Sequence, residues 1–228
     1  MDSPHSLTAL IFAAASLGFA HTIVGPGHYL PFASLAKFGN WSYFRTMCAV
    51  FACGFAHVLS SLAIGAAGLA LGAGVGALER VEGSRADIVK WVFLAFAAAY
   101  LAFALRSAFR NRADSRPSSE EPGGAGARRG DRTTFWLLFA IFAFGPCEVL
   151  IPLVMYPAAS FDWLGVLAVA VAFSAATLIT MLAAVSALYF GLKGVNTGGL
   201  ERWGNAITGL VFLACAVFML LGEGAHAA

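Results

Sequence analysis

The sequence predicts an all-α integral membrane protein with six transmembrane helices, arranged as two inverted three-helix repeats in which helices 1 and 4 are broken. Three observations lead to this fold class. Hydrophobic residues make up 60% of the 228-residue chain and charged residues only 11%, which excludes an ordinary soluble globular domain. Long charge-free segments recur along the chain. A Gly-Pro sequence interrupts one such segment in each half of the chain.

The hydrophobic segments are sufficient for six membrane crossings, because a bilayer core takes about 20 apolar residues per helix. They also lack the polar face that a helix of a soluble protein would need. In chain order they cover residues 7–36, 46–78, 91–105 (lengthened by Ile88 and Val89), 134–161, 163–192 and 203–222. Residues 1–106 are therefore expected to form the first three-helix repeat, and residues 134–228 the second.

Residues 107–133 separate the two repeats. They combine Pro, Gly, Ser and mixed charges without apolar periodicity, which predicts a disordered linker. Because each repeat has three spans, an odd number, the two copies must cross the membrane in opposite orientations.

The basic residues predict the orientation of the chain. With the N-terminus outside, eleven of the 14 Lys and Arg residues fall on the inner side, and three (Arg80, Arg85 and Lys90) fall in an outer loop. The positive-inside rule then makes the linker cytoplasmic and places both termini outside. Residues 1–6 lack the basic region of a secretory signal, so we expect the first segment to remain as a span of the cell (inner) membrane.

The two breaks occupy matching positions in the halves. Gly25-Pro26-Gly27-His28 in the first half corresponds to Gly145-Pro146-Cys147-Glu148 in the second. Proline cannot donate a main-chain hydrogen bond, so each break frees carbonyl groups at membrane depth. Free main-chain groups are tolerated there only where protein or a water-filled cavity satisfies them. A kink that serves helix packing is the alternative, but two matched breaks, each followed by a potential ligand, favour a cation pathway.

Five side chains are candidate metal ligands, because polar groups at membrane depth are costly and usually line a substrate path. They are His21, His28, His57, Cys147 and Glu148. Imidazole and thiolate groups favour transition-metal ions. Alternatively, His57 hydrogen-bonds a neighbouring helix, and Cys147 is simply a small apolar residue.

Glu148 is the only carboxylate within the six predicted spans. It would act as a ligand, as a proton carrier coupled to transport, or as the hydrogen-bond partner that orients a histidine. Four hydroxyls in the second spans of the two halves, Ser60, Ser61, Thr177 and Thr180, are expected to hydrogen-bond between helices.

The residues around these histidines resemble a known family. The sequence Gly18-Phe19-Ala20-His21, followed by Pro26-Gly27-His28, then His57 with Ser60 and finally Pro146-Cys147, is similar to the nickel/cobalt efflux permeases and the urease- and hydrogenase-accessory permeases of the lysine-exporter-like superfamily. The resemblance implies a six-span transporter whose substrate is a divalent transition-metal ion handled by histidines of the first two spans. The chain departs from the family in having one extra residue between the paired histidines, Glu148 after Pro-Cys, and no histidine-rich central loop. These departures leave the metal and the direction of transport open.

A second resemblance implies a different function. Gly145-Pro146-Cys147 with Pro152 is similar to the membrane thiol-disulfide electron carriers of cytochrome c maturation. A dithiol relay needs two sulfur atoms within bonding reach, and the first break has Gly27 or His28 where the second cysteine belongs. Cys48 and Cys53 would have to replace it.

The remaining expectations concern activity and partners. An enzyme is not expected, because the chain has no soluble catalytic domain and no His-Glu-x-x-His sequence. The expected partners are the lipid bilayer and the metal ion, without nucleic acid, and homo-oligomerisation is left open.

Overall fold

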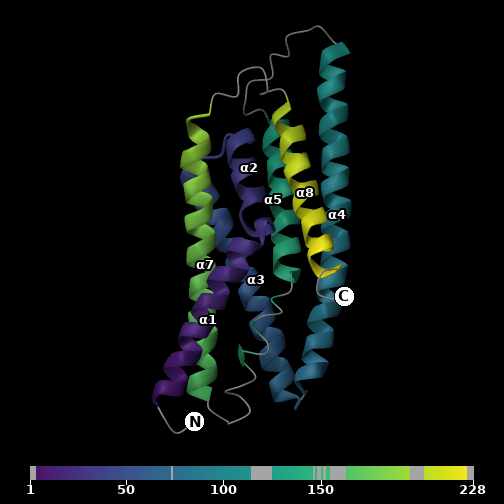
Figure 1. Cartoon of the computed structure of the whole chain (residues 1–228). Helices are drawn as coiled ribbons and strands as arrows, with labels where there is room; N and C mark the ends of the chain where they lie inside the picture. Colours follow the sequence, from purple (N-terminus) through teal and green to yellow (C-terminus); the bar gives the residue numbers. More distant parts are fainter. Residues whose placement is uncertain are drawn as a thin grey trace.

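The computed structural model describes residues 4–72, 74–113, 125–145, 147, 150, 153–154, 163–195 and 203–224, and within them every regular element is helical. The helices form an elongated bundle in which most of them run side by side (Figure 1). In chain order the elements are α1 (Pro4–Val24), η1 (Pro26–His28), α2 (Leu30–Phe38), α3 (Tyr43–Ala70), α4 (Val75–Ala113), α5 (Ala125–Phe144), α7 (Trp163–Lys193) and α8 (Gly204–Gly224).

Five of these helices are long and apolar enough to cross a membrane, which indicates a multi-pass membrane protein. Their apolar segments are Leu7–Val24, Tyr43–Gly68, Gly76–Arg110, Trp163–Lys193 and Gly204–Leu221. Large apolar side chains on the outside of the bundle, among them Phe44, Phe103 and Leu164, are more than three-quarters exposed and suit contact with lipid. The fourth predicted span, 134–161, is represented in the described residues by a shorter apolar helix, Arg132–Phe144 in α5.

The first predicted span is broken where the sequence indicated. α1 ends at Val24, a single 3-10 turn covers Pro26–His28, and α2 begins at Leu30. The main chain remains hydrogen-bonded through this break: the Gly25 N–H donates to the His21 carbonyl (3.1 Å). The freed carbonyl of Ile23 accepts a hydrogen bond from the Tyr29 hydroxyl at 3.1 Å. Hydrogen bonds within the protein thus satisfy main-chain groups at the break, as is required at membrane depth.

The second break also begins where it was predicted. α5 ends at Phe144, and Gly145 and Cys147 are not helical. Pro146 and Glu148 lie outside the described residues. In Figure 1, α1 and α5 approach from opposite ends of the bundle and both end near its middle.

The third span is longer than predicted. The predicted segment, residues 91–105 with Ile88 and Val89, is only part of α4, which begins at Val75 and has an apolar segment of 35 residues, Gly76–Arg110. Arg85 and Lys90, expected in an outer loop, lie in this helix, where Lys90 is buried and Arg85 is half-buried. Glu82 is fully buried there as well, so Glu148 is not the only carboxylate in an apolar span.

The cause of this error is charge pairing within α4. Glu82 forms an ion pair with Arg85, three residues further along the helix. Lys90 contacts the Asp87 carboxylate at 3.2 Å. Opposite charges at this spacing lie on one face of a helix and offset one another. Counting charges alone therefore began the predicted span too late in the chain. α4 and α5 also extend into the predicted linker, over residues 107–113 and 125–133.

The helices pack in pairs around the two breaks. α1 lies along α7, α5 along α3, and α4 along α8, while α3 also contacts α7. Small residues permit close approach at these contacts. A Cβ atom added to Gly18 in α1 would lie 2.8 Å from the Phe173 carbonyl oxygen of α7, and one added to Gly209 in α8 would lie 2.8 Å from the Leu101 Cα of α4. This packing brings the two breaks to one cavity.

Candidate metal site

Three histidines from three elements, α1, η1 and α3, come together at the first break. His21 lies one turn before the end of α1, and His28 ends the 3-10 turn after Pro26. Their ring centroids are 4.8 Å apart. His57, from the middle of α3, has its ring centroid 6.4 Å from that of His21 and 5.5 Å from that of His28. The predicted convergence of the three histidines is therefore present.

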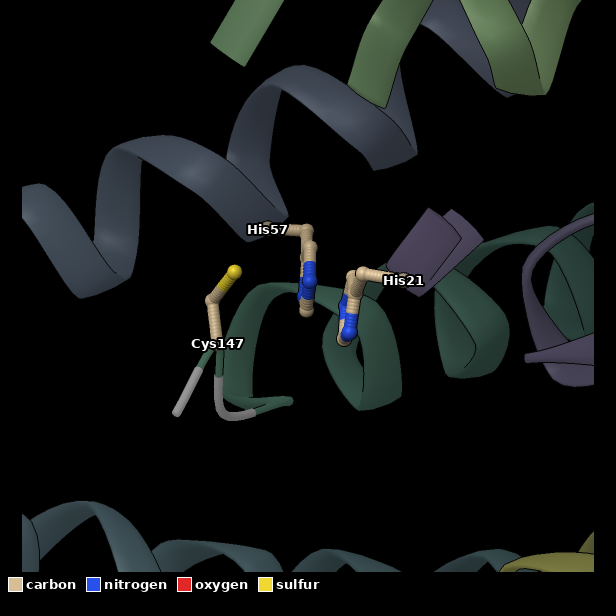
Figure 2. A group of neighbouring side chains, drawn as sticks. All are labelled: His21, His57 and Cys147. Atoms are coloured by element: carbon tan, nitrogen blue, oxygen red, sulfur yellow. The ribbon is translucent and has the colours of Figure 1, made fainter. Parts of the chain in front are cut away.

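Cys147, from the second break, completes the cluster. Potential ligand atoms of His21, His57 and Cys147 all lie within 4.8 Å of one another. In Figure 2 the His21 and His57 rings lie nearly parallel, and the Cys147 side chain extends beside them. A tetrahedral ion with bonds of about 2.0–2.3 Å has its ligands roughly 3.5 Å apart. The three donors would have to draw together by about 1 Å to bind such an ion.

The hydrogen bonds of the histidines determine which ring nitrogen each presents. The Nδ1 atom of His57 lies 3.3 Å from the Phe142 carbonyl oxygen, and Nδ1 of His28 lies 3.0 Å from the Gly25 carbonyl oxygen. Because a carbonyl can only accept, Nδ1 carries the proton in both rings and Nε2 keeps its lone pair. A carbonyl partner of this kind is typical of histidines that bind metal through the other nitrogen.

The Nε2 atoms of His21 and His57 are buried, and neither has a hydrogen-bond partner among the described residues. Leaving a buried polar atom unpaired is unfavourable. Both histidines belong to the cluster with the Cys147 thiol, so a cation with affinity for nitrogen and sulfur would satisfy them.

A cavity of about 330 Å³ adjoins these donors. Both breaks contribute to its wall, the first through Gly25 and Gly27 and the second through Gly145. The three histidines, Lys90 and Met219 also line it. The two breaks therefore share a single cavity.

The glycine of each break lies against a histidine ring. A Cβ atom added to Gly25 would be 2.5 Å from Nδ1 of His28, which leaves no room for a side chain. A Cβ atom added to Gly145 would be 3.2 Å from Nδ1 of His57. These glycines therefore allow the rings to pack directly on the main chain.

The main chain of the second break is held by polar groups of α3 and α4. The Cys147 N–H donates to the Ser61 hydroxyl at 3.1 Å and to the Glu82 carboxylate at 3.3 Å. The Arg85 guanidinium donates to the Ser60 hydroxyl at 3.2 Å and to the Gly145 carbonyl at 3.5 Å.

Of the four expected interhelical hydroxyls, Ser60 joins α3 to α4 and Ser61 joins α3 to the second break. The Thr180 hydroxyl instead donates within α7 to the Ala176 carbonyl at 2.7 Å, and the Thr177 hydroxyl has no hydrogen-bond partner among the described residues.

Glu82 and Arg85 were not among the site residues predicted from the sequence. A signal for them exists in the sequence, because Glu82 continues the buried stripe of α4 at helical spacing. That stripe consists of Ala86, Val89, Phe93 and Ala97. A carboxylate in register with buried apolar residues, three positions before an arginine, indicates a buried ion pair.

The four cysteines all lie in the described part of the chain, and none of them forms a disulfide. Cys53 packs in the core cluster that contains Phe32 and Phe212, whereas Cys147 belongs to a different core cluster with Phe173. Cys48 is exposed and Cys215 is buried.

The fold and the cluster define a class: a multi-pass α-helical membrane protein with a buried His-His-Cys donor set between two helix breaks. No protein-family model, curated protein or solved structure matches the chain.

Proposed function

We propose that the protein is a transporter of the cell (inner) membrane that moves a divalent transition-metal cation, of the nickel or cobalt kind, through the site between its two helix breaks. The observation that carries this proposal is the pair of buried, unpartnered Nε2 atoms of His21 and His57 beside the Cys147 thiol. Imidazole and thiolate donors favour borderline and soft ions over Mg²⁺, Ca²⁺ or Mn²⁺.

The proposal includes two inverted three-helix repeats, and the packing of the helices supports it. The six predicted spans correspond to α1, α3, α4, α5, α7 and α8 in chain order. If the two repeats are exchanged, so that α1 replaces α5, α3 replaces α7 and α4 replaces α8, the α1–α7 contact becomes the α5–α3 contact, and both are present. The α3–α7 and α4–α8 contacts are unchanged by this exchange, and both are also present. Repeats with matched broken helices place a transporter's substrate site at their interface.

Metal accumulation in cells tests the function. Cells that express the protein should differ from vector controls in their content of at least one ion among Mn, Fe, Co, Ni, Cu and Zn. His21→Ala and His57→Ala should each abolish the difference, because each removes one of the two orphaned nitrogens. Equal metal content in expressing and control cells, for all six ions, would refute the proposal.

The thiol-disulfide carrier remains the alternative, and Cys147→Ser separates the two functions. A thiol relay loses all activity without its sulfur. A histidine-centred ion site keeps two nitrogen donors and should be weakened rather than lost. Complete loss in Cys147→Ser, with retained activity in His21→Ala, would favour the carrier.

A further inference from the structure

α4 supplies a buried ion pair to a site whose candidate ligands all come from other elements. Glu82 is fully buried, and its two carboxylate oxygens have different partners. One oxygen accepts from Arg85, and the other accepts from the main-chain N–H of Cys147. Glu82 thus contacts the residue that offers the sulfur donor without itself belonging to the donor set.

A buried ion pair rarely stabilises a fold more than apolar side chains of the same volume would, because removing two charges from water is costly. Its presence in an apolar helix therefore calls for another reason. Arg85 brings a positive charge to the second break, where it donates to the Gly145 carbonyl. Gly145 in turn lines the same cavity as the three histidines. Without a counter-charge, this guanidinium would repel a cation in the site.

We infer that Glu82 is a positioning residue for the cation site, and that it also neutralises Arg85 so that a divalent cation can bind nearby. Through the Cys147 N–H it holds the second break so that the thiol lies beside His21 and His57. This inference rests on the proposed function, since it assigns a role at the same site.

The two partners of the ion pair then have opposite effects on cation affinity. Glu82→Gln leaves Arg85 uncompensated beside the site, whereas Arg85→Gln leaves a carboxylate that attracts a cation. If the pair only supported the fold, losing either partner would be equally harmful, because each loss leaves one buried charge alone. The difference between the two variants is therefore the signature of the inferred role.

Titration of the purified full-length protein with Co²⁺ tests the inference, because Co²⁺ absorbs visibly when bound and shows a charge-transfer band when a thiolate is among its ligands. In Glu82→Gln the dissociation constant for Co²⁺ should rise by about 10- to 100-fold, the usual effect of losing a group that supports a ligand. In Arg85→Gln it should rise by less than in Glu82→Gln, or fall. Glu79→Gln removes the same charge from an exposed position of α4 and should leave the titration unchanged.

Glu82→Asp tests the positioning role separately and serves if Glu82→Gln fails to fold. It keeps the charge but shortens the side chain by one methylene, so it should weaken the thiolate-to-cobalt band more than it weakens affinity. Equal losses of affinity in Glu82→Gln and Arg85→Gln, or an unaltered spectrum and affinity in Glu82→Asp, would overturn the inference. Absence of Co²⁺ binding by the unaltered protein, together with unchanged metal content in cells, would overturn the proposed function and this inference with it.

Discussion

At the scale of single residues, hydrogen bonds to neighbouring main-chain groups set the orientation of two histidine rings. The His28 ring donates a hydrogen bond to the Gly25 carbonyl in the first break. The His57 ring donates one to the Phe142 carbonyl, just before the second break. Each of these carbonyls also accepts a main-chain N–H at its break, from His28 to Gly25 and from Gly145 to Phe142, both at 3.0 Å. The histidine ring therefore uses the second acceptor position of a carbonyl at the break, and this bond orients the imidazole.

Gly25→Ala should disturb the site directly. The added Cβ would lie 2.5 Å from Nδ1 of His28, so the ring must move and its bond to the Gly25 carbonyl must lengthen. We expect Co²⁺ affinity to fall by about tenfold or more, in line with the loss of a group that orients a ligand. Gly65→Ala, in open space on α3, should leave affinity unchanged. Equal affinities of the two variants would contradict this packing.

Gly145→Ala should have a smaller effect of the same kind. The added Cβ would lie 3.2 Å from Nδ1 of His57, a contact that a few tenths of an ångström would relieve. The same Co²⁺ titration measures the difference. A larger loss in Gly145→Ala than in Gly25→Ala would show that the second break is the less adaptable of the two.

At the scale of elements, α4 differs most from its prediction. A window of low charge selects only residues 88–105, yet the helix extends from Val75 to Ala113. Glu82 and Arg85 are compatible with an apolar span because they pair with one another and hydrogen-bond to the second break. α4 is thus both a span and the support of a neighbouring broken helix.

The close contact of α4 with α8 should be sensitive to side-chain volume. An added Cβ at Gly209 would meet the Leu101 Cα at 2.8 Å, and a main-chain atom cannot rotate away. Gly209→Ala should therefore destabilise the protein by about 1–3 kcal/mol, as overpacking does. Thermal unfolding in detergent would show this as a lower midpoint.

Gly191→Ala in α7 is the matched control, because nothing lies within 4 Å of the added Cβ. It should stabilise its helix by up to about 1 kcal/mol, because alanine has the higher helix propensity. A lower midpoint for Gly191→Ala than for Gly209→Ala would contradict the α4–α8 contact.

At the scale of the whole molecule, the two halves meet where each is interrupted. The cavity takes its wall from both breaks, from α3 and from α4, so neither half contains the site alone. The end of α2 also meets the end of α7: the Lys37 ammonium donates to the Leu192 carbonyl at 2.8 Å. This contact agrees with the prediction that Lys37 and Lys193 lie on one side of the membrane.

Membrane topology provides the test at this scale. Single cysteines introduced within residues 114–124 should react with a membrane-impermeant thiol reagent only after cells are opened, because that segment is predicted to be cytoplasmic. Cysteines placed at either terminus should react in intact cells. The reverse pattern would invert the orientation, and termini on opposite sides would exclude an even number of crossings.

The sequence by itself determined that this is a multi-pass membrane protein, where each of the two helix breaks begins, and which residues are candidate donors. Hydrophobic length, proline and glycine act locally, so His21, His28, His57 and Cys147 could be singled out without a structure. Glu148 lies outside the described residues, so its role remains a prediction.

Only the tertiary structure decided which groups act together. The pairing of Glu82 with Arg85 has a local signal, but their hydrogen bonds to the main chain at Cys147 and Gly145 join residues about 60 positions apart. The orientation of each imidazole likewise depends on a carbonyl supplied by a helix end. Such contacts follow from how helices pack, and helix packing is set by close approach at residues such as Gly18 and Gly209. No local pattern in the chain encodes that geometry.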